Sequence, residues 1–181
     1  MRVTDEQVAA LHALLALDSP EAERLTGRLI DNEDLDGYGG LAYAAFVIAT
    51  RRRFSLTWSL PELIRFVAAV RVDLAQDDVD IDPHAAEVAL RRALDERVAA
   101  EPSQEAMARA QFFLLQEMVL EARLDDVELD EFLKSALEAA DGVITASPNR
   151  LPPRRKPMSV WSPITGASST DGTGAGNRTS E

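Results

Sequence analysis

Apolar residues recur at steps of three and four positions along almost all of residues 1–146. This is the spacing of α-helices that bury one face. No segment alternates between apolar and polar residues for long enough to predict a β-strand. Helix-start signals divide the pattern into about seven segments joined by short polar loops. The sequence therefore predicts an all-α fold, with about seven helices in a single compact, bundle-like domain over residues 1–146.

Capping residues indicate where these helices begin. Thr4 with Gln7, and Ser59 with Glu62, have the spacing of capping boxes, in which two side chains satisfy the free amides of the first turn. The last helix is expected to stop at Asp141–Gly142, because glycine is common just past a helix C-terminus. Helix starts are predicted near Thr4, Ser19, Tyr38, Ser59, Asp82, Ser103 and Asp125.

The segment from about Tyr38 to Arg53 is apolar on nearly every side. A helix without a polar face is normally surrounded by other elements. We therefore expect this helix at the centre of the domain, with Phe46 among its most buried side chains.

Three arginines, Arg51, Arg52 and Arg53, end the predicted central helix, where cations interact favourably with the helix dipole. The basic and aromatic residues of this stretch are also typical of nucleic-acid-binding surfaces. We favour the first interpretation, with Phe54 and Trp58 packed into the core, because the surrounding domain is acidic. The arginines would then pair with acidic loops or form a docking point for a partner.

Charge is unevenly distributed along the chain. Residues 1–146 hold 14 basic and 29 acidic residues, a formal charge of −15, whereas residues 147–181 hold five and two, a charge of +3. Nucleic acids and anionic membranes attract positive charge, so the acidic domain disfavours both as partners. The most apolar run, Leu41–Ala49, is also far shorter than the ~20 residues of a membrane span.

Several features predict a cytoplasmic location. The N-terminus carries acidic residues where a signal peptide would have a basic region. The chain contains no cysteine, which excludes disulfides, thiolate zinc sites and a cysteine nucleophile and fits a reducing compartment. Arginine outnumbers lysine 17 to 2, which indicates a bacterial genome of high G+C content.

Residues 147–181 differ from the rest of the chain in being rich in Pro, Gly, Ser and Thr and lacking periodicity. This composition predicts a disordered tail. A short basic, proline-rich stretch in it is a candidate linear binding motif, although its prolines lack the spacing that SH3-type grooves recognise. Its candidate interaction residues are Arg154, Arg155, Lys156 and Trp161.

One loop begins like a calcium-binding loop. Asn32, Asp34 and Asp36 supply oxygen donors at alternate positions, and Gly37 follows where the loop turns sharply. The bidentate glutamate expected at the twelfth position is replaced by Tyr43, which leaves the oxygen cage open. We expect Asp34 and Asp36 to serve the turn and the start of the central helix, with Gly37 relieving backbone strain. A metal site here is the alternative.

Two six-residue acidic segments also bear on the alternative of a metal site. Residues 77–82 and 125–130 share the pattern Asp-Asp-Val-acid-apolar-Asp, and each precedes or opens a predicted helix. They represent either a duplication or two independent acidic helix starts, and helix N-termini favour acids in any case. The second segment adds Asp125, Asp126 and Asp130 to Asp34 and Asp36 as candidate metal ligands.

The stretch from Ala122 to Asp141, ARLDDVELDEFLKSALEAAD, resembles the acidic loop and helix of tellurite-resistance TerB-like domains. It covers 20 of the 181 residues and lacks the Asp-Gly pair of such loops. The resemblance implies a small, acidic, all-helical domain and is in keeping with the divalent-cation alternative.

The sequence carries none of the common catalytic or nucleotide-binding motifs. Its two histidines, His12 and His84, are isolated. We therefore expect a non-catalytic adaptor or regulatory domain that binds a protein partner and needs no cofactor. The alternatives are a divalent-metal-binding helical domain, or an enzyme with an unrecognised carboxylate site.

Overall fold

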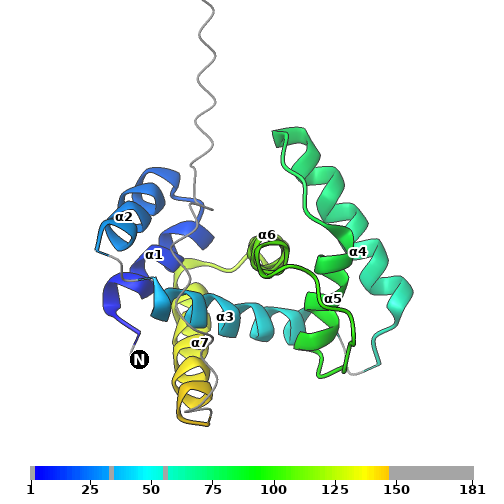
Figure 1. The fold of residues 1–181 in the computed structure, drawn as a ribbon. Helices are drawn as coiled ribbons and strands as arrows, with labels where there is room; N and C mark the ends of the chain where they lie inside the picture. The colour runs from blue at the N-terminus through cyan, green and yellow to red at the C-terminus, as the bar shows by residue number, and fades with distance from the viewer. Residues whose placement is uncertain (1–2, 33–34, 55–56, 147–181) are drawn as a thin grey trace, which may run out of the picture.

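The computed structural model describes residues 3–32, 35–54 and 57–146, with Asp36 and residues 142–146 described for the backbone alone. These ranges form seven α-helices and no β-strand, which confirms the all-α prediction (Figure 1). The helices are α1 (Asp5–Leu15), α2 (Ser19–Asp31), α3 (Asp36–Arg53), α4 (Leu60–Leu74), α5 (Pro83–Ala93), α6 (Gln104–Ala122) and α7 (Asp126–Ala146), and a short 3₁₀ helix, η1 (Ala75–Asp77), follows α4.

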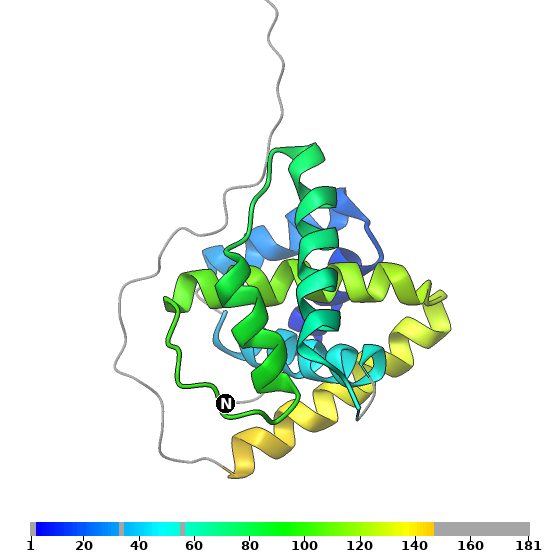
Figure 2. The same ribbon diagram turned by 90° about the vertical axis from the view of Figure 1, so that its right-hand side faces the viewer.

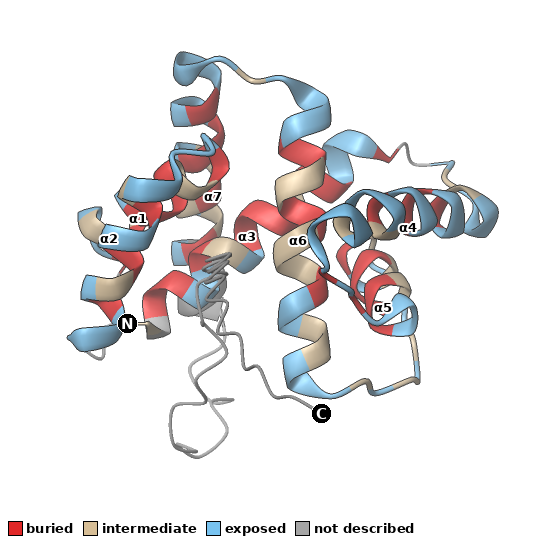
Figure 3. Cartoon of the chain, turned by 90° about the horizontal axis from the view of Figure 1, so that it is seen from above, coloured by how far each residue is buried: buried red, intermediate tan, exposed pale blue. Residues whose placement is uncertain are grey.

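The central position predicted for α3 is confirmed. This helix packs against α1, α5, α6 and α7, and Phe46 at its middle is completely buried. Buried residues gather along α3 and on the neighbouring helices (Figure 3). Phe54, just after the helix, is buried, and the partly buried Trp58 packs against the core, as expected.

The remaining helices lie on two sides of α3. The α1–α2 pair occupies one side, with α7 beside α1, whereas α4 and α5 lie together on the other side (Figure 1). Figure 2 is seen from that second side, with α4 in front and α6 crossing behind it. The outer face of α4 therefore lies at the periphery of the domain.

The two predicted capping boxes have different outcomes. At α1, the Gln7 amide N–H donates to Thr4 Oγ1 (3.3 Å) and the Thr4 N–H donates to Gln7 Oε1 (3.1 Å), so this box is formed. At α4 the prediction is wrong, because the Ser59 side chain makes no capping hydrogen bond. The Glu62 N–H instead donates to the backbone carbonyl of Ser59 (3.0 Å), which removes the donor that the hydroxyl would bind.

The last helix begins where it was predicted, near Asp125, but ends later than predicted. Asp125 and Glu128 form a reciprocal capping box at its start, with N–H donors 2.8 and 3.0 Å from the opposing carboxylates. Its predicted stop at Asp141–Gly142 is wrong, since α7 continues to Ala146. Glycine permits a helix to end but does not force it to, and Gly142 is helical here.

Candidate functional site

The three consecutive arginines at the end of α3 point to different surroundings. Arg51 closes the C-terminus of α5: its Nε donates to the Ala93 carbonyl (3.0 Å), and its Nη2 donates to both carboxylate oxygens of Asp95 (2.9 and 2.8 Å). The last carbonyls of a helix need such external donors. Arg51 therefore has a structural role.

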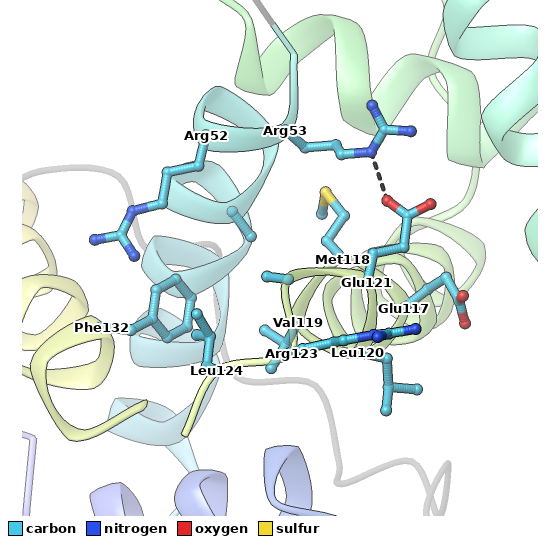
Figure 4. A pocket seen from close by; sticks show the side chains of 12 residues that line it. Arg52, Arg53, Glu117, Met118, Val119, Leu120, Glu121, Arg123, Leu124 and Phe132 are labelled. Atoms are coloured by element: carbon cyan, nitrogen blue, oxygen red, sulfur yellow. Dashed lines mark hydrogen bonds and ion pairs between the residues drawn. The ribbon is translucent and has the colours of Figure 1, made fainter. Parts of the chain in front are cut away.

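Arg53 and Arg52 reach in opposite directions (Figure 4). Arg53 donates from Nε to Glu121 on α6 (2.5 Å), and its guanidinium lies 5.2 and 5.3 Å from the ring centroids of Phe54 and Phe66. Arg52 instead lies over the ring of Phe132, 5.2 Å from its centroid. Within the described ranges, Arg52 has no hydrogen bond or ion pair, so its guanidinium donors are available at the surface.

A groove of about 750 Å³ opens beside Arg52 and Arg53, between the end of α3 and the α6–α7 turn (Figure 4). Its floor is apolar, because buried side chains from three helices meet there, and Leu120 is exposed at its edge. The lining residues are Ala49, Arg52, Arg53, Glu117, Met118, Val119, Leu120, Glu121, Ala122, Arg123, Leu124 and Phe132.

The charge of this groove is opposite to that of the protein. Three arginines and two glutamates line it, a formal charge of +1, whereas the whole chain carries −12. The third arginine, Arg123, caps α6 in the left-handed conformation (φ 50°) and is exposed. Like Arg52, it makes no ion pair to any residue that the structure describes.

The two acidic side chains of the groove are not equivalent. Glu121 binds Arg53, whereas Glu117 is partly buried beside it. Loss of hydration raises the pKa of the Glu117 carboxyl, and the nearby carboxylates of Asp73 and Glu121 raise this pKa further. The groove thus contains two arginines without an ion pair among the described residues, Arg52 and Arg123. It also contains Glu117, whose ionised form is disfavoured by burial and by neighbouring carboxylates.

Chemically, the groove offers guanidinium donors above an apolar floor. Its lining includes no histidine, serine, threonine or lysine, and its acidic side chains are Glu117 and Glu121. Guanidinium groups bind carboxylates through charge-assisted, often bidentate hydrogen bonds. The arrangement is suited to binding an acidic group that is attached to apolar ones.

The candidate metal ligands that the structure describes do not form one site, and they have different contacts. Asp125 caps α7, and Asp130 lies 3.4 Å from His12 Nε2 on α1. Asp126 is exposed in the first turn of α7, the side chain of Asp36 is not described, and Asp34 lies outside the described residues. Over the described parts of the chain, no three His, Asp or Glu side chains come together in a way that could hold a metal ion.

The two similar acidic segments fold differently. In residues 77–82 the last residue, Asp82, caps α5 by accepting from the His84 and Ala85 amides, and Val79 is buried. In residues 125–130 the first residue is the cap, and Val127, which corresponds to Val79, is exposed. Both segments are helix starts, with the cap at opposite ends of the pattern.

The role expected for Gly37 is wrong. None of the described glycines has a positive φ, and Gly37 is buried in the first turn of α3. A Cβ atom at this position would collide with Oε1 of Gln7, the oxygen that completes the α1 capping box. The glycine makes room for this buried amide rather than relieving backbone strain.

Sequence reasoning identified the arginines of α3 but missed the rest of the groove. Glu117, Leu120 and Arg123 come from α6 and its C-cap, and no motif links them to Arg52. The tail candidates Arg154, Arg155, Lys156 and Trp161 lie outside the described residues.

No protein-family model matches the chain, and comparisons with curated proteins and with solved structures give no significant match. Among the described residues, no helix is both long enough and apolar enough to cross a membrane.

Proposed function

We propose that this chain is a non-catalytic protein–protein interaction domain, an adaptor or regulator, that binds an acidic segment of a partner protein. The binding site is the groove between the end of α3 and the α6–α7 turn. The observation that carries the proposal is the pair of exposed arginines, Arg52 and Arg123, that line an apolar groove without a carboxylate partner among the described residues.

The absence of a carboxylate partner at Arg52 and Arg123 in the described structure is notable because the chain is acidic. In a chain with 31 acidic and 19 basic residues, a surface arginine has many carboxylates available, and the neighbours Arg51 and Arg53 both bind one. Arg52 and Arg123 do not, so a partner carboxylate gains two strong donors without breaking an existing ion pair. Arginine, methionine and aromatic residues are also enriched at protein–protein interfaces.

The lining defines the chemistry of the partner. Leu120 is exposed and Leu124 half-buried beside the arginines, which suits leucine or aromatic side chains next to an acidic one. The volume of about 750 Å³ is enough for a few side chains rather than for a folded domain. A short acidic and apolar segment therefore fits better than a flat protein surface, and we expect micromolar affinity, since such interfaces are small.

Nucleic acid is a poorer candidate for the same groove. Phosphates would meet Glu117 and Glu121 as well as the arginines, and the whole chain would repel the polyanion. An acidic peptide carries fewer negative charges than a nucleic acid, and it can place a single carboxylate against the arginines without a second one near Glu117 or Glu121.

The test is selection from a display library of random peptides of about twelve residues, followed by affinity measurement on the enriched peptides by fluorescence anisotropy. We expect enrichment of sequences with Asp or Glu next to Leu or an aromatic residue. The double variant Arg52→Glu/Arg123→Glu should weaken their binding about tenfold or more, since two attractive contacts become repulsive.

Arg97→Glu is the matched control. Arg97 is an exposed arginine with no ion pair in the described structure, and it lies in the loop after α5, outside the groove lining. Its reversal changes the net charge in the same direction as each groove reversal and should alter binding by less than about twofold. Equal binding by wild type and the double variant, or an equal loss in Arg97→Glu, would contradict the proposal.

A further inference from the structure

The outer face of α4 carries an apolar row that nothing in the described structure covers. Leu60, Ile64, Ala68 and Val72 are spaced four residues apart and are all exposed, with Ile64 at 50% and Val72 at 66%. The opposite side of α4 packs into the core through other residues. A surface helix normally presents polar residues outward, so a second apolar row indicates a contact surface.

A second exposed row runs beside the first. It consists of Pro61, Arg65, Ala69 and Asp73. Arg65 donates only to the Pro61 carbonyl within its own helix (3.2 Å), and Asp73 has no hydrogen bond or ion pair in the described part of the chain. The two opposite charges are eight residues apart, too far to meet each other along one helix.

These two rows are self-complementary. Ile64 and Val72 are equidistant from Ala68, and Arg65 and Asp73 are equidistant from Ala69. A two-fold axis near this pair of alanines would place Ile64 against Val72 of a second copy, and Arg65 against Asp73 of that copy. Small residues at the crossing point allow two helices to approach closely, and both contacts occur twice, as an isologous interface requires.

We propose that α4 is a homodimerisation surface, at which it pairs antiparallel with α4 of a second copy of this chain. The helix lies at the edge of the domain, in front of the other elements when viewed from its own side (Figure 2). Its 15 residues give a contact about 22 Å long. One helix pair of this length buries less than a typical stable interface, so the dimer is weak and exchanges with monomer.

Sedimentation velocity over about 5–500 µM protein tests this directly, with an expected dimer dissociation constant on the order of tens of micromolar. Val72→Glu should raise that constant about tenfold or more, because it buries an unpaired carboxylate against Ile64 of the second copy. Val127→Glu is the matched control: Val127 is equally exposed, at 68%, but lies on α7, and its substitution should leave dimerisation unchanged.

A charge-exchange series tests the pairing itself. Arg65→Asp and Asp73→Arg should each weaken the dimer about tenfold, and the double variant should recover to within about threefold of wild type. Circular dichroism melts check that each variant is folded. A wild type that remains monomeric at the highest concentration would refute the dimer, and a double variant without recovery would refute the antiparallel pairing.

The groove variant Arg52→Glu/Arg123→Glu separates the two proposals. It should dimerise like wild type, because neither residue lies on α4, whereas Val72→Glu should bind the selected peptides like wild type. Loss of both properties in either variant would show that the two surfaces are not independent.

Discussion

The two ends of α3 differ in how far their side chains are committed to the fold. At its start, Gly37 and Tyr38 are buried, and the missing side chain of Gly37 accommodates the Gln7 amide. At its end, Arg51 and Arg53 bind carboxylates, while Arg52 covers an aromatic ring and keeps its donors free. The start of α3 is therefore closely packed, whereas its end carries one arginine, Arg52, whose hydrogen-bond donors have no partner among the described residues.

If the groove binds a peptide as proposed, the start and middle of α3 serve stability and its end serves binding. Substitutions at the start and middle of α3 should change the free energy of unfolding, because they alter close packing. Substitutions at Arg52 should leave stability nearly unchanged and alter binding. The following variants test this separation in order of decreasing effect.

Phe46→Ala should have the largest effect. Phe46 is completely buried at the middle of α3, and removing a buried aromatic side chain leaves a cavity that costs ~3–5 kcal/mol. Urea denaturation followed by circular dichroism measures this loss. A loss below about 1 kcal/mol would show that α3 is not the centre of the core.

Gly37→Ala and Gly40→Ala should have opposite signs. A methyl group at Gly37 displaces the Gln7 side chain and its hydrogen bond to Thr4, which should cost ~1–2 kcal/mol despite the gain in helix propensity. Gly40 is exposed with no atom near its Cβ position, so alanine there should stabilise by up to ~1 kcal/mol. Equal effects in the two variants would contradict the packing role of Gly37.

Substitutions of Arg51 and Arg52 should differ by a smaller amount in the free energy of unfolding. Arg51→Ala removes the donor to the end of α5 and should destabilise by ~0.5–1.5 kcal/mol. Arg52→Ala removes no ion pair but removes the exposed contact with the Phe132 ring, so it should cost ~0.5 kcal/mol, less than Arg51→Ala. A larger loss at Arg52 than at Arg51, measured by the same denaturation, would assign Arg52 to the fold instead of to the groove.

Glu117→Gln should be slightly stabilising at neutral pH. The pKa of Glu117 is raised in the folded protein by burial and by Asp73 and Glu121, so ionisation at neutral pH disfavours the folded state. Glutamine cannot ionise, and its Tm advantage should disappear below about pH 4, where the glutamate is protonated in both states. A variant that melts lower than wild type at neutral pH would contradict the direction of this pKa shift.

The fold was predictable because its signals are local. Apolar spacing and the caps of α1, α5 and α6 each depend on residues within a few positions of one another, and the apolar character of α3 predicted its burial. The errors arose where tertiary packing or competing hydrogen bonds decide. Gly37 depends on Gln7 of another helix, and the Ser59 hydroxyl loses its donor to its own backbone carbonyl.

The groove was only partly predictable for the same reason. The run of arginines is visible in the sequence, but their different partners, Asp95, Glu121 and Phe132, lie 44, 68 and 80 positions away. Which arginine remains without a carboxylate depends on how α3 packs against α5, α6 and α7. The likeness of the two acidic segments was similarly uninformative, because the cap residue, and not the pattern, sets where each helix starts.

The most direct test of the division along α3 is an amide chemical-shift titration with the tightest-binding acidic peptide from the selection. We expect shifts at Ala49–Arg53, in the last turn of α6 with Arg123 and Leu124, and at Phe132, with none at residues 37–45. These shifts should disappear in Arg52→Glu/Arg123→Glu. Shifts centred on the start of α3, or binding without any shift around the groove, would show that the end of α3 is not the binding site.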